Sequence, residues 1–179
     1  MSISHAFQLD PYYPCDPVTD LTGVFSVNDS NIKLELTLRG DTHQVHWPIY
    51  PRQRTTGLWE DTCFEFFLGQ VGQSHYVEVN LSPGGAWNSF AFRDVRTDMV
   101  ETKLIQLSSS QCQRTDTEAH FSATLTHELP VGEYELGISA VVKSEAGKLS
   151  YYALQHSGSR PDFHDRRGWC IQLPISKQT

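Results

Sequence analysis

The fold is decided by residues 57–93, which read GLWEDTCFEFFLG at 57–69 and, after a short turn, HYVEVNLSPGGAWNSFAFR at 75–93. In three runs of this stretch, at 63–68, 76–81 and 87–93, an apolar set of side chains alternates with a mostly polar and aromatic set. Because successive side chains of a β-strand point to opposite faces, each run predicts a strand with one apolar set in a core. The short connections between the runs predict three successive antiparallel strands near the middle of the fold.

The other set of side chains is expected to gather on the opposite face of this sheet. That set is mostly polar and aromatic, and it consists of Glu65, Tyr76, Glu78, Asn80, Trp87 and Arg93. Carboxylates, an amide, a guanidinium and aromatic rings on one face are typical of a surface that binds a small polar ligand. The sequence thereby predicts where a site lies without naming its ligand.

Working outward, alternation and turn residues predict more short strands on both sides of the central stretch. We expect them at residues 21–27, 32–39, 43–47, 120–126, 134–142, 150–156 and 169–173, with a mixed pattern over 100–107. Residues 1–17 contain three prolines and predict an irregular N-terminal arm, and the Ser/Gln-rich segment 108–117 predicts a mobile connector. About nine to eleven strands without helical periodicity predict a single all-β domain over 1–179, an antiparallel β-sandwich of jelly-roll type.

Charge and composition exclude several classes of partner. The net charge of −7 argues against a nucleic acid or an anionic membrane surface, since neither would be neutralised. The N-terminus lacks a basic leader with an apolar run, and no apolar segment reaches the roughly 20 residues of a membrane span, so we expect a cytoplasmic protein. The cysteines at 15, 63, 112 and 170 are far apart and are expected to be free.

Four stretches resemble a known family. They are LWEDTCFEFF (58–67), YVEVNLSPGGAWNSFAF (76–92), FRDVRTDM (92–99) and YYALQHSGSRPDFHDR (151–166). They are similar to the DOMON-like and family 9 carbohydrate-binding-module superfamily, and more closely to a bacterial single-domain DOMON-like subgroup. The resemblance implies a β-sandwich that binds a ligand, a sugar or haem, and performs no chemistry. Haem-binding members use a Met and a His as axial ligands, for which Met99 and His156 would be the candidates here.

Glu65 and Glu78 lie on neighbouring predicted strands and leave three interpretations open. They could accept hydrogen bonds from sugar hydroxyls, act as a glycosidase pair, or form a buried structural network with Arg54, Arg93 or Arg96. The aromatic residues are equally open, because a Trp can stack on a sugar ring or simply fill the core. Trp59 and Trp87 are the stacking candidates that we favour.

Residues 157–167 predict a polar loop that carries the densest group of ligand-type side chains. His156, Asp162, His164 and Asp165 could close over the site, hold zinc or iron, or stabilise the loop through an Asx-turn at Asp162. His43 and His46 are three residues apart on a predicted strand, so their rings would point to opposite faces. No nucleophile elbow, phosphate-binding glycine loop or zinc-protease helix motif is present in the sequence.

Together these patterns predict a non-catalytic domain that binds a small molecule, a saccharide or sugar-containing metabolite, with no cofactor and no metal. A haem- or metal-binding domain that uses His156, Met99 or His164 is one alternative, and a protein-interaction module is the other. Oligomeric state does not follow from the sequence. The predicted ligand-binding residues are Trp59, Glu65, Tyr76, Glu78, Asn80, Trp87, Arg93, His156, Asp162 and His164.

Overall fold

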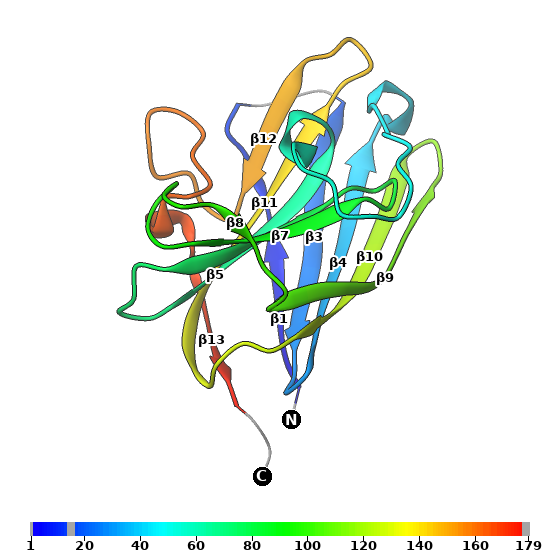
Figure 1. The fold of residues 1–179 in the computed structure, drawn as a ribbon. Helices are drawn as coiled ribbons and strands as arrows, with labels where there is room; N and C mark the ends of the chain where they lie inside the picture. Colours follow the sequence, from blue (N-terminus) through cyan, green and yellow to red (C-terminus); the bar gives the residue numbers. More distant parts are fainter. Residues whose placement is uncertain (1, 14–16, 177–179) are drawn as a thin grey trace.

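The computed structural model describes residues 2–13 and 17–176 (Figure 1). In this part of the chain, thirteen β-strands form two sheets, and the strands pair antiparallel. The five-stranded sheet has the order β1 (Ile3–Gln8), β3 (Val18–Val27), β4 (Asn31–Gly40), β10 (Glu118–His127), β9 (Ile105–Arg114). The eight-stranded sheet has the order β2 (Asp10–Pro11), β12 (Leu149–Ala153), β11 (Gly132–Lys143), β5 (Cys63–Gln70), β6 (Tyr76–Leu81), β7 (Trp87–Phe92), β8 (Val100–Glu101), and β13 (Ile171–Ile175) also pairs with β11.

Figure 1 shows β5 and β7 of the larger sheet crossing in front of β3 and β4 of the smaller one. The predicted antiparallel β-sandwich of jelly-roll type is therefore confirmed. Three 3-10 helices, η1 (Thr42–Gln44), η2 (Leu58–Glu60) and η3 (Arg166–Gly168), complete the described elements. Among the described residues, no helix is long and apolar enough to cross a membrane.

The main core lies between the sheets and is built from the inward set of each alternating strand. In β4, Ile32 and Leu34 are buried while Lys33 between them is exposed. In β5, Phe64 and Phe66 are buried in the same core cluster. Burying an aliphatic or aromatic side chain of this size contributes about 1.5–3 kcal/mol, so the regular alternation is enough to hold the two sheets face to face.

The eight-stranded sheet is buried on its outer face as well. A second cluster there consists of Phe67, Tyr76, Phe90, Phe92 and Trp169, with Trp59 and Phe163 packed against it. Every residue of β6, and every residue of β5 except the last, is accordingly buried. The outer cluster and the loops that cover it position the candidate site.

The predicted irregular arm over residues 1–17 is wrong for most of its described part. Residues 3–8 form β1, which pairs with β3, and residues 10–11 form β2, which pairs with β12. Gly23 explains the close fit, because a side chain at that position would overlap the ring of Phe7. These additions also raise the strand number above the nine to eleven expected. Residues 1 and 14–16 of the expected arm lie outside the described residues.

Two other local predictions differ from the structure. The Ser/Gln-rich connector over 108–117 is mostly strand, because β9 extends to Arg114 and pairs with β10. As an edge strand, β9 can keep a polar solvent-facing surface while its backbone is hydrogen-bonded on one side. The strand expected over 43–47 is instead η1 followed by an isolated bridge at Val45, and the Asp41 side chain accepts a hydrogen bond from the His43 amide at its start.

Candidate functional site

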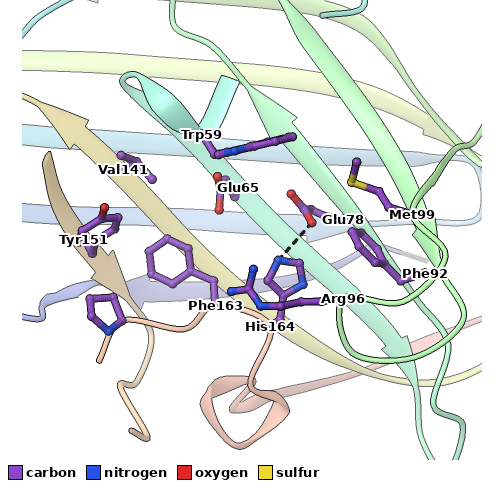
Figure 2. Close-up of a pocket in the computed structure, with 11 residues that line it drawn as sticks. Trp59, Glu65, Glu78, Phe92, Arg96, Met99, Val141, Tyr151, Phe163 and His164 are labelled. Carbon is purple, nitrogen blue, oxygen red and sulfur yellow. Dashed lines mark ion pairs between the residues drawn. The ribbon is translucent and has the colours of Figure 1, made fainter. Parts of the chain in front are cut away.

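A cleft of about 430 Å³ opens on the outer face of the eight-stranded sheet. Its size lies within the roughly 300–1,000 Å³ that small-molecule sites occupy. The sheet contributes Glu65, Glu78, Phe92, Val141 and Tyr151 to the lining. Loops and η2 contribute Trp59, Arg96, Met99, Phe163 and His164, as Figure 2 shows.

Glu65 and Glu78 bring two buried carboxyl groups to this cleft. In the register of β5 and β6, Glu65 pairs with Asn80 and Glu78 pairs with Phe67, so the two glutamates lie on the same face. Their exposed fractions are 3% and 5%. Asn80 Nδ2 donates to Glu78 Oε1 at 2.7 Å, and Ser139 Oγ donates to Glu65 Oε2 at 3.2 Å.

Burial makes both carboxyl groups weak acids. It raises the pKa of Glu78 to about 7, against the opposing effects of the Asn80 hydrogen bond and the Arg96 charge. Burial, and then the negative charge of Glu78, also raise the pKa of Glu65 well above its usual range. Because the two groups interact, they titrate as a pair. Near neutral pH the pair therefore holds protons that exposed glutamates would have released.

His164 is fixed over the pair by a chain of hydrogen bonds. The Arg96 backbone N–H donates to Tyr76 Oη at 3.2 Å, and Tyr76 Oη lies 2.6 Å from His164 Nδ1. Burial raises the pKa of Tyr76 to about 12, so its hydroxyl keeps its proton and donates it to Nδ1. The His164 proton is then on Nε2, which approaches Glu78 Oε2 at 3.6 Å (Figure 2). Burial and Arg96 lower the pKa of His164 to about 4, so this contact joins a neutral imidazole to the carboxyl group rather than two charges.

Trp169 anchors the loop that carries Phe163 and His164. Its indole stacks on Phe67 with ring centroids 5.6 Å apart, and its Nε1–H donates to the Phe163 carbonyl at 2.9 Å. Gly137 lies directly beneath the indole, where a Cβ would overlap the Trp169 ring. Because Gly137 has no side chain, Trp169 can pack directly on β11. The loop that Trp169 anchors then keeps His164 at the cleft.

An ion pair between Arg96 and Asp162 joins the two loops that border the cleft. Arg96 Nη2 donates to Asp162 Oδ1 at 2.9 Å, and the same carboxylate oxygen accepts the His164 backbone N–H at 3.1 Å. Arg96 has a backbone φ of 53°, in the left-handed region that non-glycine residues rarely occupy. Such a conformation persists only where neighbouring contacts hold it, as the Asp162 and Tyr76 contacts do here.

The structure brings several of the predicted residues together. Trp59, Glu65, Glu78 and His164 line the cleft itself. Tyr76, Asn80 and Asp162 lie directly behind them and hydrogen-bond to His164, Glu78 and Arg96 respectively. The predicted face is therefore real for β5, β6 and part of the polar loop.

The predicted position of Trp87 on this face is wrong. Trp87 pairs with Leu81 and belongs to the main core, where the Arg54 guanidinium lies 4.3 Å from its ring centroid. Phe90 and Phe92, which the alternation placed in that core, face the outer cluster instead. Both faces of β7 are buried, so the apolar pattern did not indicate which set points inward.

Arg93 and His156 also lie away from the cleft, contrary to prediction. Arg93 is an exposed residue that forms an ion pair with Asp98 at 2.9 Å. His156 Nε2 contacts the Asp10 carbonyl at 2.9 Å, and its ring packs edge-on against Tyr12. Met99 lines the cleft, whereas His156 is not among the residues that line it.

The glutamates are not part of the structural ion-pair network that we considered. Within residues 2–13 and 17–176, Arg54 donates to Asn88, while Arg93 and Arg96 pair with aspartates. No group of three or more described His, Cys, Asp or Glu residues is arranged to hold a metal ion. The prediction of free cysteines is confirmed at 63, 112 and 170, and Cys15 lies outside the described residues.

The predicted ligand-binding residues did not include the cleft residues Phe92, Arg96, Tyr151 and Phe163. Arg96 was expected only as a structural partner of the glutamates, and Met99 only as a haem ligand. Arg96 and Met99 are in the stretch FRDVRTDM, and Tyr151 and Phe163 are in YYALQHSGSRPDFHDR. Those two stretches carry the family resemblance, and they were the signal that could have found these residues. Alternation could not place Arg96, Met99 and Phe163, because it says nothing about loops, and it assigned Phe92 in β7 to the wrong face.

Comparison with known proteins relates the fold to carbohydrate-binding modules. No protein-family model matches the chain, and no curated protein matches it in sequence. A proposed carbohydrate-binding protein from Bacteroides uniformis has a similar structure, with a TM-score of 0.70, 13% identity, and 96% of this chain and 86% of that chain covered. Structures of a family 9 carbohydrate-binding module from Caldicellulosiruptor kristjanssonii are also similar. Its complex with glucose gives a TM-score of 0.60, 4% identity, and coverage of 94% and 82%. Its complex with cellotriose gives a TM-score of 0.63 and 5% identity, with 98% of this chain and 84% of that chain covered. At these identities the likeness concerns the fold.

Proposed function

We propose that this protein is a non-catalytic module that binds a saccharide or a sugar-containing metabolite in the cleft over β5 and β6. The observation that carries the proposal is a pair of buried carboxyl groups, Glu65 and Glu78, at the base of an aromatic-walled cleft. A buried carboxyl group without its full set of hydrogen bonds favours a ligand that supplies them. Sugar hydroxyls both donate and accept, and so fit either protonation state of the pair.

The walls of the cleft suit the remaining surface of a sugar ring. Trp59 lies on one side, and Phe163 with Tyr151 lies on another, in edge contact with ring centroids 6.0 Å apart. Aromatic faces pack against the apolar faces of sugars, while polar groups at the base fix orientation. Gly57, with a φ of 83°, precedes η2 and allows the turn that presents Trp59.

The structural neighbours support this proposal, since one is a proposed carbohydrate-binding protein and others hold glucose or cellotriose. The DOMON-like subgroup and a cytoplasmic location belong to the same proposal. The subgroup rests on the four resembling stretches. A carboxyl pair is also the machinery of glycosidases, so the absence of chemistry is tested along with binding.

Calorimetric titration with glucose, cellotriose and a panel of mono- and oligosaccharides tests the proposal, preceded by an absorbance spectrum to detect haem. We expect one sugar class to bind and to be recovered unchanged. Trp59→Ala should weaken binding about tenfold or more and Trp59→Phe should restore most of it, because the ring provides the contact. Glu78→Gln should also weaken binding. Its matched control is Glu133→Gln, which changes an exposed acid on β11 and should leave the affinity unchanged. Cleavage of the sugar, or a haem band, would contradict the proposal.

A further inference from the structure

The cleft holds two carboxyl groups that no described cation pairs with. Glu65 and Glu78 are both more than nine-tenths buried and both line the cavity. Among the described residues, the Ser139 hydroxyl donates to Glu65 Oε2, and no donor reaches Oε1. Figure 2 shows the two carboxyl groups turned toward the same space, bounded by Trp59 above and by Phe163 and His164 below.

Arg96 is the cation in the cleft, and it is already engaged elsewhere. Its guanidinium pairs with Asp162 at 2.9 Å, and 59% of its side chain is exposed. Among the described contacts, it makes no hydrogen bond to either glutamate. The positive charge of Arg96 still lowers the pKa of both glutamates, but burial outweighs it, and the ion pair with Asp162 and solvent screening weaken it. His164 is neutral and presents one N–H to Glu78.

The aromatic lining favours a cation as well. Rings of Trp59, Phe92, Tyr151 and Phe163 line the same cavity as the two carboxyl groups. The face of an aromatic ring carries a negative quadrupole and attracts an ammonium group, most strongly where water is excluded. Carboxyl groups and aromatic rings that line one space are therefore complementary to a positively charged nitrogen more than to a neutral hydroxyl.

Building on the saccharide-binding function proposed above, we infer that the cleft selects a sugar that carries a protonated amino group. The ammonium group lies against Glu65 and Glu78, and the ring lies between Trp59 and Phe163. Transfer of a charged amine to this site satisfies carboxylate oxygens that no described side chain reaches. A neutral sugar of the same shape leaves them with hydroxyl contacts alone.

Proton release gives a readout that neutral ligands do not share. An ammonium group favours ionised carboxylates, so it should expel the protons that the buried pair holds near neutral pH. The ionisable or polar groups that face the pair from the neighbouring elements are Cys63, Tyr76, Asn80, Arg96, Ser139 and His164. Calorimetry in buffers of different ionisation enthalpy measures the number of protons released.

The test compares glucosamine, glucose and N-acetylglucosamine on the whole chain, since these differ in the charge and substituent at one position. We expect glucosamine to bind at least about tenfold more tightly than both others, the scale of one charge-assisted hydrogen bond, with proton release. In the double variant Glu65→Gln, Glu78→Gln, glucosamine and glucose should bind about equally. In the control Glu133→Gln, the preference for glucosamine should stay at its wild-type value.

Cyclohexylamine and cyclohexanol, measured on the same protein, separate the two proposals. Equal binding of glucose and glucosamine would overturn the amine inference and keep the saccharide function. Binding of cyclohexylamine over cyclohexanol without any sugar binding would overturn the saccharide function and keep selection of a cation. No binding by any of the five compounds would overturn both.

Discussion

Replacing Glu78 with glutamine should raise the stability of the unliganded protein at neutral and alkaline pH. Glu78 has a pKa of about 7 in the folded protein, raised by burial, whereas an unfolded glutamate titrates near its ordinary value of about 4.5. A carboxyl group with a raised folded pKa contributes its stability in full below about pH 4.5. That contribution is lost as the pH rises through about 7, because the unfolded state then gives up the proton more readily.

The magnitude follows from the same linkage. Ionising Glu78 in the folded state costs about 3 kcal/mol of the free energy of unfolding at pH 8, and under about 1 kcal/mol at pH 5. Glutamine has nearly the same shape, and its Oε1 can still accept the Asn80 hydrogen bond. Its amide N–H groups are left poorly paired, at a cost of about 1 kcal/mol. The net gain at pH 8 is about 2 kcal/mol, or about 4–8 °C in Tm for a chain of this size.

Urea unfolding of the wild type, Glu78→Gln and the exposed control Glu133→Gln at pH 5, 6, 7 and 8 measures the effect. We expect the wild type and Glu78→Gln to be nearly equal at pH 5, to diverge up to about pH 7 and to differ little more at pH 8, while the control follows the wild type. A Glu78→Gln variant that is less stable at every pH, or a difference independent of pH, would refute the reasoning that burial penalises the carboxylate. The same variant should bind ligand more weakly, so stability and affinity move in opposite directions.

Three other substitutions test how the site is built. Gly137→Ala places a Cβ against the Trp169 indole and should cost about 1–3 kcal/mol, with a shift in tryptophan fluorescence; an unchanged urea midpoint would show that the loop is not anchored there. Tyr76→Phe leaves His164 Nδ1 without its donor and should cost about 1–3 kcal/mol, and ¹⁵N NMR of the imidazole should report the changed tautomer. Trp87→Ala should cost about 3–5 kcal/mol yet leave the affinity of the folded protein unchanged in calorimetry, because Trp87 lies in the core and not in the cleft.

The sequence was most informative where one geometric rule governs both faces of a strand. Residues 63–68 and 76–81 alternate strictly, and pleating alone places Glu65 and Glu78 on the face opposite Phe64 and Phe66. The relative register of the two strands then brings the glutamates into one cavity. Because the alternation of side-chain direction along each strand is local, the face on which each glutamate lies followed from the sequence.

The same rule gave the wrong faces for β7, because both faces of that strand carry apolar side chains. Trp87 packs in the main core and Phe92 packs in the outer cluster, so both phases of the strand are apolar and either assignment satisfies the pattern. Only pairing with β6 fixes the phase, and pairing is a long-range property. The strand Ile3–Gln8 was missed as well, although its side chains alternate between a half-buried or buried face and an exposed one, with Phe7 in the main core. It pairs with β3 at the edge of the smaller sheet.

Arg96, Met99 and Phe163 could not be placed from the sequence, because loops obey no period. Arg96 adopts a left-handed backbone that ordinary residues avoid, and contacts with Tyr76 and Asp162 hold it. Those partners are 20 and 66 residues away in the chain, so nothing local predicts the conformation. The loop side of the cleft depends on contacts between residues far apart in the sequence, so a local pattern cannot predict it.

Two buried carboxyl groups are what sets this sheet apart from one optimised for stability. Most of the chain is locally consistent, with apolar residues on buried faces and charges at the surface. Glu65 and Glu78 break that pattern at the centre of the sheet, and no described cation forms an ion pair with them. Glutamine or leucine would fill either position with less penalty. The larger the gain in stability that glutamine gives here, the harder it is to explain the two glutamates by folding alone, and the stronger the case that a ligand accounts for them.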